Sequence, residues 1–178
     1  PTYARAYAGL ASVELLNSNA AGAQGERPIA DVLPVAQELL DRAMELAPDD
    51  AAVWLRVALL RQFGGDFAGA EAAYVKAREL QSNINLNNYA VMLGQQDRVL
   101  DGAELLAQQK EVNPRSPAIR GNLIAAYARL ERFDDAEREL AEFKEQFPDA
   151  KGQFSAVHVE SGLRMSRGEW ARAGESAQ

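Results

Sequence analysis

The stretch AAVWLRVALLRQFGGDFAGAEAAYVKARELQS, residues 51–82, decides the fold, because its pattern of large and small side chains recurs along the chain. Steps of 34, 32 and 34 residues align four rows of positions that pass through this stretch. The rows are Leu33, Phe67, Val99 and Phe133; Ala36, Ala70, Gly102 and Ala136; Leu40, Tyr74, Leu106 and Leu140; and Pro48, Ser82, Pro114 and Pro148. Four independent rows that keep one period predict an array of helical repeats.

Each row has a physical reason. The second row holds only Ala or Gly, which predicts that two helices approach each other closely there. The first and third rows place a large side chain three or four positions to either side, on the same face of a helix. The fourth row predicts a helix end, since proline cannot continue the hydrogen-bond ladder of a helix.

A second set of positions predicts another helix in each unit. These positions are Trp54, Val57 and Ala58; Leu86, Tyr89 and Ala90; and Arg120, Leu123 and Ile124. Asp49 or Asp50 is expected to cap the helix after Pro48, and Ser116 followed by Pro117 is typical of a helix start. The residues Gly64, Gly65 and Asp66 indicate a tight turn between the two helices of one unit.

The combined pattern resembles a known repeat family. The positions Trp54, Val57, Ala58, Gly65, Phe67, Ala70, Tyr74 and Ala77 are similar to the tetratricopeptide repeat signature, with Arg61 where that family has an aromatic residue. This resemblance implies an all-α fold, a right-handed α-α superhelical solenoid of tetratricopeptide repeats. The large residues Trp54, Tyr74 and Tyr127 are then expected in the core.

The period divides a single repeat domain, residues 1–178, into five units. We expect units over residues 2–50, 51–82, 83–116 and 117–150, and a partial or capping unit over 151–178 that includes Gly168, Trp170 and Ala173. The first unit has a long loop, 17–28, between its helices, which is either a functional segment or a tolerated insertion. Because the chain starts at Pro1 without a methionine and stops at Gln178 within an element, we expect a fragment or a processed chain.

The composition excludes several classes of function. The net charge of −7 argues against nucleic acid as a partner, and no apolar run is long enough for membrane insertion. The absence of cysteine excludes disulfides and is compatible with the cytoplasm or the periplasm, and the alanine-rich composition suits a bacterial source. The expected partner is therefore a protein or a peptide.

The resemblance also implies where a partner binds. In this family the first helix of each unit lines a concave groove that holds extended segments or helices. The residues expected to bind the partner are Arg56, Leu59, Asn87, Asn88, Val91, Asn122 and Arg129. The carboxylate clamp of heat-shock co-chaperones is missing, because Leu55 and Leu59, or Ala8 and Ser12, occupy its positions.

Two features of this groove have competing interpretations. Asn88 and Asn122 lie 34 residues apart, so they are either a ladder of amides that binds a partner's backbone or common consensus residues that cap turns. Arg56, Arg120 and Arg129 either bind an acidic partner or are ordinary surface arginines.

The sequence predicts no enzyme, no cofactor and no metal site. His158 is the only histidine, and with Glu160 it lacks further ligands at a convincing spacing. The pairs Asp49–Asp50 and Asp134–Asp135 are expected at helix starts, where carboxylates favour the helix dipole.

The expected function is a scaffold or adaptor for protein–protein interaction. One alternative is a regulatory or assembly module of a longer bacterial protein, such as a transcription regulator, a nucleotide cyclase, or a component of secretion or pilus assembly. Another alternative is a domain that forms a homo-oligomer through a terminal repeat, because an array that ends within a unit exposes an apolar surface.

Overall fold

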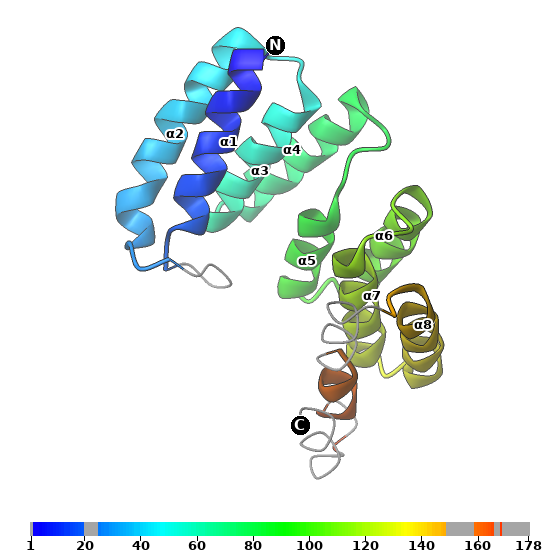
Figure 1. Cartoon of the computed structure of the whole chain (residues 1–178). Coiled ribbons are helices and arrows are strands. Elements are labelled where there is room, and N and C mark those ends of the chain that lie inside the picture. The colour runs from blue at the N-terminus through cyan, green and yellow to red at the C-terminus, as the bar shows by residue number, and fades with distance from the viewer. Residues whose placement is uncertain (1, 20–24, 149–158, 166–167, 169–178) are drawn as a thin grey trace. The chain divides into compact units, whose positions relative to one another are not determined.

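A computed structural model describes residues 2–19, 25–148, 159–165 and 168 of the chain (Figure 1). Within these residues the fold is all-α, and extended pairing is limited to an isolated bridge between Ser18 and Arg27. The helices are α1 (Thr2–Leu16), α2 (Ile29–Leu46), α3 (Ala51–Phe63), α4 (Phe67–Leu80), α5 (Asn87–Gln95), α6 (Val99–Val112), α7 (Pro117–Arg129) and α8 (Phe133–Gln146). Residues 159–165 form a further helical segment.

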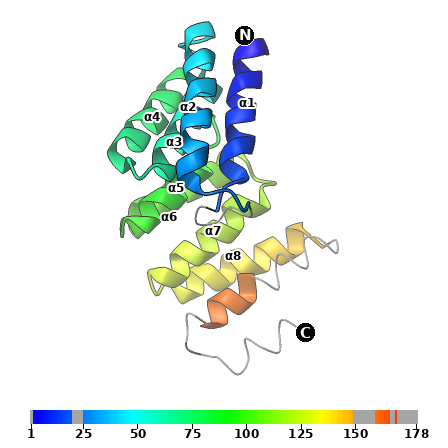
Figure 2. The same cartoon turned by 90° about the vertical axis from the view of Figure 1, so that its left-hand side faces the viewer.

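The chain divides into two compact units, Pro1–Ile84 and Asn85–Gln178. In the first unit, α1 packs against α2, α3 packs against α4, and α3 also contacts α1 and α2. In the second unit, α5 packs against α6 and α7 against α8, while α7 also contacts α5 and α6. Each unit thus contains two helical hairpins, and Figure 2 shows α1 beside α2 and α7 beside α8.

The row of small residues lies where helices approach most closely. Ala36, Ala70 and Ala136 are fully buried, and Gly102 is buried as well. A Cβ atom on Gly102 would lie 2.7 Å from the carbonyl oxygen of Ala90, so α5 and α6 could not keep their present separation with a larger residue there. The predicted close approach of helices at this row is confirmed.

The large side chains that the repeat pattern places toward the core are buried to different degrees. The third row, Leu40, Tyr74, Leu106 and Leu140, is buried. In the first row, Leu33, Val99 and Phe133 are half-buried and Phe67 is exposed. Of the three aromatic residues expected in the core, Tyr74 is buried, but Trp54 and Tyr127 are only half-buried. The Trp54 indole donates a hydrogen bond to the Pro48 carbonyl oxygen at 2.7 Å, which holds it at the margin of the core.

The predicted helix ends agree with the structure. Helices α2, α4, α6 and α8 end at Leu46, Leu80, Val112 and Gln146, each two residues before its member of the fourth row. At the start of α3 the Asp50 carboxylate accepts the Ala52 N–H, and at the start of α7 the Ser116 hydroxyl accepts the Ile119 N–H. Gly65 adopts a φ of +80°, as the tight turn between α3 and α4 requires.

The long connection in the first unit lies between Leu16 and Ile29, as expected. Its described parts make specific contacts. The Asn19 N–H donates to the Arg27 carbonyl oxygen at 2.8 Å, and the Asn19 side chain accepts the Ile29 N–H at 3.1 Å. Ser18 is buried, and Arg27 forms an ion pair with Glu14. The two ends of the connection are therefore fastened to α1 and α2.

Helix α5 starts four residues later than residue 83, where its predicted unit begins. The Leu86 N–H donates to the buried side-chain oxygen of Gln109 at 3.0 Å, and the Asn87 N–H donates to the Asn85 side chain at 2.9 Å. Asparagine side chains stabilise turns by such bonds to the backbone, in competition with helix. Residues 83–86 consequently lie outside the helix and lead into it.

Among the helices of the described ranges, none is both long enough and apolar enough to cross a lipid bilayer. For the expected fifth unit, residues 159–165 are helical, and Leu163 packs with Ile124 and Phe143 in the core of the second unit. Trp170 and Ala173, which were expected in the second helix of that unit, lie outside the described residues.

Candidate functional site

The structure brings three of the predicted partner-binding residues to one pocket. Val91 on α5 and Asn122 and Arg129 on α7 all line it, and Asn87 on α5 contacts Asn122. Asn88 is exposed and does not line the pocket.

The other two predicted residues belong to the first unit. Arg56 and Leu59 lie on α3, where both are half-buried. Leu59 packs against the core of that unit, so much of its side chain contributes to the fold and is not available to a partner. The pocket of the second unit is accordingly the candidate functional site.

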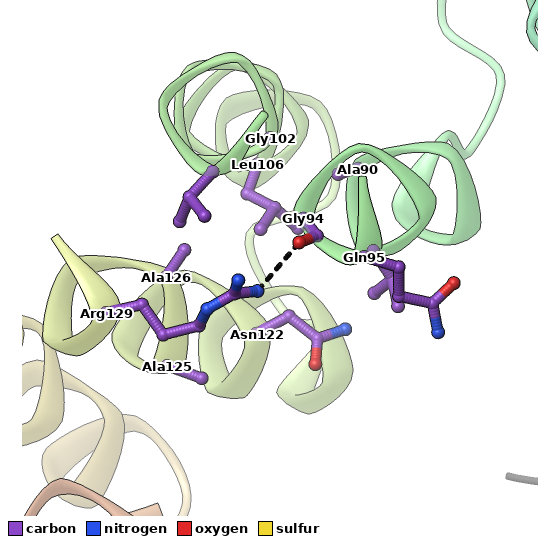
Figure 3. A pocket seen from close by; sticks show the side chains of 11 residues that line it. Ala90, Gly94, Gln95, Gly102, Leu106, Asn122, Ala125, Ala126 and Arg129 are labelled. Carbon is purple, nitrogen blue, oxygen red and sulfur yellow. Dashed lines mark hydrogen bonds between the residues drawn. The ribbon is translucent and has the colours of Figure 1, made fainter. Parts of the chain in front are cut away.

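The pocket is formed by α5, α6 and α7 and has a volume of about 160 Å³. Most of its lining is apolar: Ala90, Val91, Val99, Leu106, Ala125 and Ala126. Figure 3 shows these helices around the pocket, with Asn122 and Arg129 projecting from α7. Ligand pockets combine an apolar lining with a few polar groups and usually measure roughly 300–1,000 Å³, so this smaller pocket has room for about one side chain of a ligand.

The amide pair differs from the predicted ladder. The Asn122 Nδ2 donates a hydrogen bond to the Asn87 Oδ1 at 2.9 Å, so on α5 the partner of Asn122 is Asn87, the neighbour of the equivalent residue Asn88. Successive residues of a helix point about 100° apart, and here Asn88 is the one that faces solvent. The pair still presents the Asn87 Nδ2 donor and the Asn122 Oδ1 acceptor, which complement the C=O and N–H of a peptide backbone.

Arg129 is held against the C-terminal end of α5. Its Nη1 donates to the Gly94 carbonyl oxygen at 2.9 Å, a contact that Figure 3 shows as a dashed line. Carbonyl groups in the last turn of a helix lack a partner within the helix, so an arginine is a suitable donor to them. The Nη2 of Arg129 lies 3.8 Å from the Asp97 carboxylate, and 49% of the Arg129 side chain is exposed.

Gly94 and Asp97 are part of this arrangement, although Asp97 was not predicted as a site residue. A Cβ atom on Gly94 would lie 3.3 Å from the Arg129 Nη1, so a side chain there would press against the guanidinium. Asp97 has a φ of 60° in the turn between α5 and α6, a conformation in which aspartate and asparagine are enriched. In the sequence, the polar turn residues Gln96 and Asp97 are the feature that could have indicated Asp97 as a site residue.

Arg120 is buried in an internal ion pair, which fits neither of its two interpretations, a contact for an acidic partner or an ordinary surface arginine. It is only 8% exposed, and its Nη1 donates to the Glu139 carboxylate at 2.6 Å. Lys110 donates to the other oxygen of Glu139 at 2.8 Å. Partial burial by itself lowers the pKa of Lys110, but the bond to Glu139 and the attraction of Glu139 and Glu142 raise it overall. In the repeat pattern Arg120 occupies the position that Trp54 occupies in the second unit. A charged residue at a position that otherwise holds a large apolar side chain could have indicated an ion-pair partner within the protein.

The acidic pairs act at helix starts and in ion pairs. Asp50 caps α3, and Asp135 in the first turn of α8 accepts from Arg132 at 2.7 Å and pairs with Arg138, contacts that lower its pKa. Glu160 pairs with Lys144 and with Arg164. His158 lies outside the described residues. In the described part of the chain no group of three or more His, Cys, Asp and Glu residues is placed to hold a metal ion.

Comparison with known proteins gives no assignment: no protein-family model matches the chain, and a search of curated proteins finds no matching relative.

Proposed function

We propose that this chain is a non-catalytic adaptor of the tetratricopeptide repeat type, which binds an extended segment of another protein along α5 and α7. The observation that carries the proposal is the pocket lined by Val91, Asn122 and Arg129, next to the amide pair of Asn87 and Asn122. The repeat type is supported by the four rows of the sequence and by the hairpin order of the helices.

The binding mode follows from the chemistry of the pocket. The pocket takes one side chain, while the amides of Asn87 and Asn122 bond the adjacent peptide backbone. Backbone bonds carry little sequence information, so the pocket supplies the selectivity.

The test is affinity purification from a lysate of the source organism, with the 178-residue chain as bait. The variant Asn87→Ala with Asn122→Ala removes both members of the amide pair and leaves no single amide without its partner. Losing two ligand hydrogen bonds at roughly 0.5–1.5 kcal/mol each should weaken binding by about fivefold to a hundredfold, at an almost unchanged melting temperature.

Asn88→Ala is the matched control, because Asn88 is an exposed asparagine on the same helix outside the pocket. We expect a specific protein to be retained by the wild type and by Asn88→Ala and to be lost with the double variant. Equal recovery by all three baits would contradict binding at this site.

Self-association is a second candidate, favoured by the outer face of α1. Tyr3, Leu10, Val13 and Leu16 form one apolar stripe on this helix, and each is more than half exposed. The positions of α3 that correspond to Leu10 and Val13, namely Val57 and Leu60, pack in the core of the first unit. The α1 stripe is therefore of the kind that another helix normally covers.

Sedimentation equilibrium tests this candidate. If copies of the chain associate, the measured mass should rise with protein concentration. Leu10→Glu with Val13→Glu should abolish this rise, and the variant should stay folded because both side chains are exposed. A wild-type mass that stays monomeric over the whole concentration range would rule it out.

A further inference from the structure

We propose that the pocket between α5, α6 and α7 recognises an extended peptide with an aliphatic side chain and, two residues away, a single acidic side chain. The aliphatic group occupies the pocket and the carboxylate binds Arg129, in competition with the chain's own Asp97. This inference rests on the proposed peptide-binding function and names the class of peptide that the site selects.

The aliphatic half of the motif follows from the walls and the size of the pocket. Ala90, Val99, Leu106 and Ala126 give it an apolar interior of about 160 Å³. An apolar cavity of about 150 Å³ is known to bind a molecule as large as benzene, so the side chain of a leucine, isoleucine or methionine fits. A charged side chain inside this space would lose its hydration without gaining a partner among these residues.

The acidic half follows from the placement of Arg129. Its Nη1 is fixed by the Gly94 carbonyl oxygen at 2.9 Å, which orients the guanidinium without neutralising it. Its Nη2 faces the Asp97 carboxylate at 3.8 Å, beyond good hydrogen-bond distance. Because half of the Arg129 side chain is exposed, a ligand carboxylate can reach it and form the paired bonds that guanidinium groups favour (Figure 3).

Asp97 is a weak internal competitor for this position. Its side chain is 99% exposed, so it loses little when a ligand carboxylate takes its place beside Arg129. Its negative charge nevertheless lowers the local potential that an acidic ligand meets. Removing that charge should therefore strengthen the binding of acidic ligands alone.

The spacing of the motif follows from the geometry of an extended chain. Alternate side chains of such a chain point to the same face and lie roughly 7 Å apart. Arg129 forms part of the pocket wall, so its carboxylate ligand must lie on the same face as the side chain in the pocket, one alternate position away. A neighbouring residue would point its side chain to the opposite face.

The overall charge limits the motif to one acidic residue. The chain has a net charge of −7, which opposes the approach of strongly acidic peptides. Arg129 is the cation that lines this pocket, and one guanidinium binds one carboxylate.

The experiment is an NMR titration of the ¹⁵N-labelled 178-residue chain with short blocked peptides. Acetyl-Leu-Ala-Glu-amide and its reversed order acetyl-Glu-Ala-Leu-amide carry the motif in its two directions. We expect one of them to shift the backbone signals of Gly94, Ala125 and Ala126, which line the pocket. The same peptide with Gln for Glu, or with Ala for Leu, should bind roughly tenfold more weakly.

Three variants separate the parts of the motif. Arg129→Gln should make the Glu and Gln peptides bind equally. Asp97→Asn keeps a residue suited to a φ of 60° and should tighten only the Glu peptide, by about twofold to fivefold. Ala125→Leu, at an exposed position on the pocket rim, should weaken every peptide because its side chain fills the pocket. Arg115→Gln, which changes an exposed arginine outside the pocket, should change nothing.

Several results would overturn the proposal. These are no shifts at the pocket with any motif peptide at millimolar concentration, equal binding of the Glu and Gln peptides, and binding of acetyl-Leu-Glu-Ala-amide as tight as that of the motif peptides. Tighter binding of N-acetylleucine would assign the carboxylate to a chain end and would also overturn it. A partner protein that still depends on Asn87 and Asn122 in the affinity experiment would then show that the adaptor function stands without this motif.

Discussion

At the scale of single residues, two glycines in helices are predicted to respond oppositely to the same substitution. A Cβ atom on Gly9 in α1 would meet nothing within 4 Å, whereas one on Gly102 in α6 would lie 2.7 Å from the Ala90 carbonyl oxygen. Gly9→Ala should raise the free energy of unfolding by about 0.4–1 kcal/mol through helix propensity. Gly102→Ala should lower it by about 1–3 kcal/mol, because α5 and α6 must move apart.

Denaturant unfolding of the two variants beside the wild type measures both changes. Each variant makes the same chemical change in a helix interior, so each controls for the propensity effect in the other. An increase in stability for both would show that α6 adjusts without cost and that the small-residue row is not needed for close packing.

The ion pair between Arg120 and Glu139 gives a second prediction at this scale. Both side chains are almost fully buried, and Glu139 also accepts from Lys110. Glu139→Ala should cost about 3–5 kcal/mol of unfolding free energy, since it leaves the buried Arg120 charge with only the longer contact to the half-exposed Glu142 carboxylate at 3.3 Å.

Replacing the pair by Arg120→Met with Glu139→Leu tests the cause of that loss. The double variant should be as stable as the wild type or more stable, because it removes both buried charges. If it were as unstable as Glu139→Ala, packing around Glu139 and not the buried charge would explain the loss.

At the scale of the elements, the start of α3 predicts a pH dependence. The Asp50 carboxylate accepts the Ala52 N–H at 2.8 Å and the Arg5 Nε at 2.7 Å. Partial burial by itself would raise the pKa of Asp50, but the bonds from Arg5 and from the Ala52 N–H hold it below its ordinary value of 3.8. A carboxyl group with a lowered pKa stabilises the fold above its unfolded-state pKa, and this contribution is lost as the pH falls through the folded-state pKa.

Asp50→Asn keeps a side chain that caps α3 but removes the charge. We expect it to be less stable than the wild type at pH 6–7, with the difference shrinking as the pH falls below the ordinary carboxyl range and vanishing once the folded wild-type carboxyl group is protonated. Asp50→Ala, which also loses the cap, should remain about 1 kcal/mol less stable at low pH. Unfolding curves over this pH range measure both, and a constant difference for Asp50→Asn would mean that the charge is unimportant.

The elements also show what could be predicted from the sequence. Helix ends near Pro48, Pro114 and Pro148, and the loop over 17–28, were predictable because proline and turn residues act locally. The start of α5 was not, because it depends on Gln109, a residue of α6 whose side chain accepts the Leu86 N–H.

Only part of the candidate site could be predicted from the sequence: Val91, Asn122 and Arg129 line the pocket, and the other predicted residues do not. The period places Asn88 and Asn122 in equivalent positions, but the amide of Asn122 bonds Asn87, one residue away. A difference of one residue rotates a side chain by about 100° around the helix, and the repeat pattern does not fix rotation that finely. Arg120 was misassigned because its partner Glu139 lies on a different helix.

At the scale of the whole molecule, the sequence period gives no sign of the division into two units. The rows continue across it with a step of 32 residues between Phe67 and Val99, yet the boundary falls between Ile84 and Asn85. Each unit nevertheless has its own core. Leu40 belongs to a cluster built from α1, α2 and α3, and Phe143 to a cluster built from α7, α8 and residues 159–165.

Two cores predict that the units lose structure separately. Phe143 and Leu40 are fully buried, so Phe143→Ala should destabilise the second unit by about 3–5 kcal/mol and Leu40→Ala the first unit by about 2–5 kcal/mol. Because local opening reports the stability of the cooperative unit that contains an amide, hydrogen exchange should reveal where each loss is felt. Phe143→Ala should accelerate exchange in α7 and α8 and leave α1 and α2 at the wild-type rate, and Leu40→Ala should do the reverse. Acceleration of all eight helices by either substitution would instead mean that the chain unfolds as one cooperative unit, in which case the continuous period of the sequence, and not the division of its contacts, describes its stability.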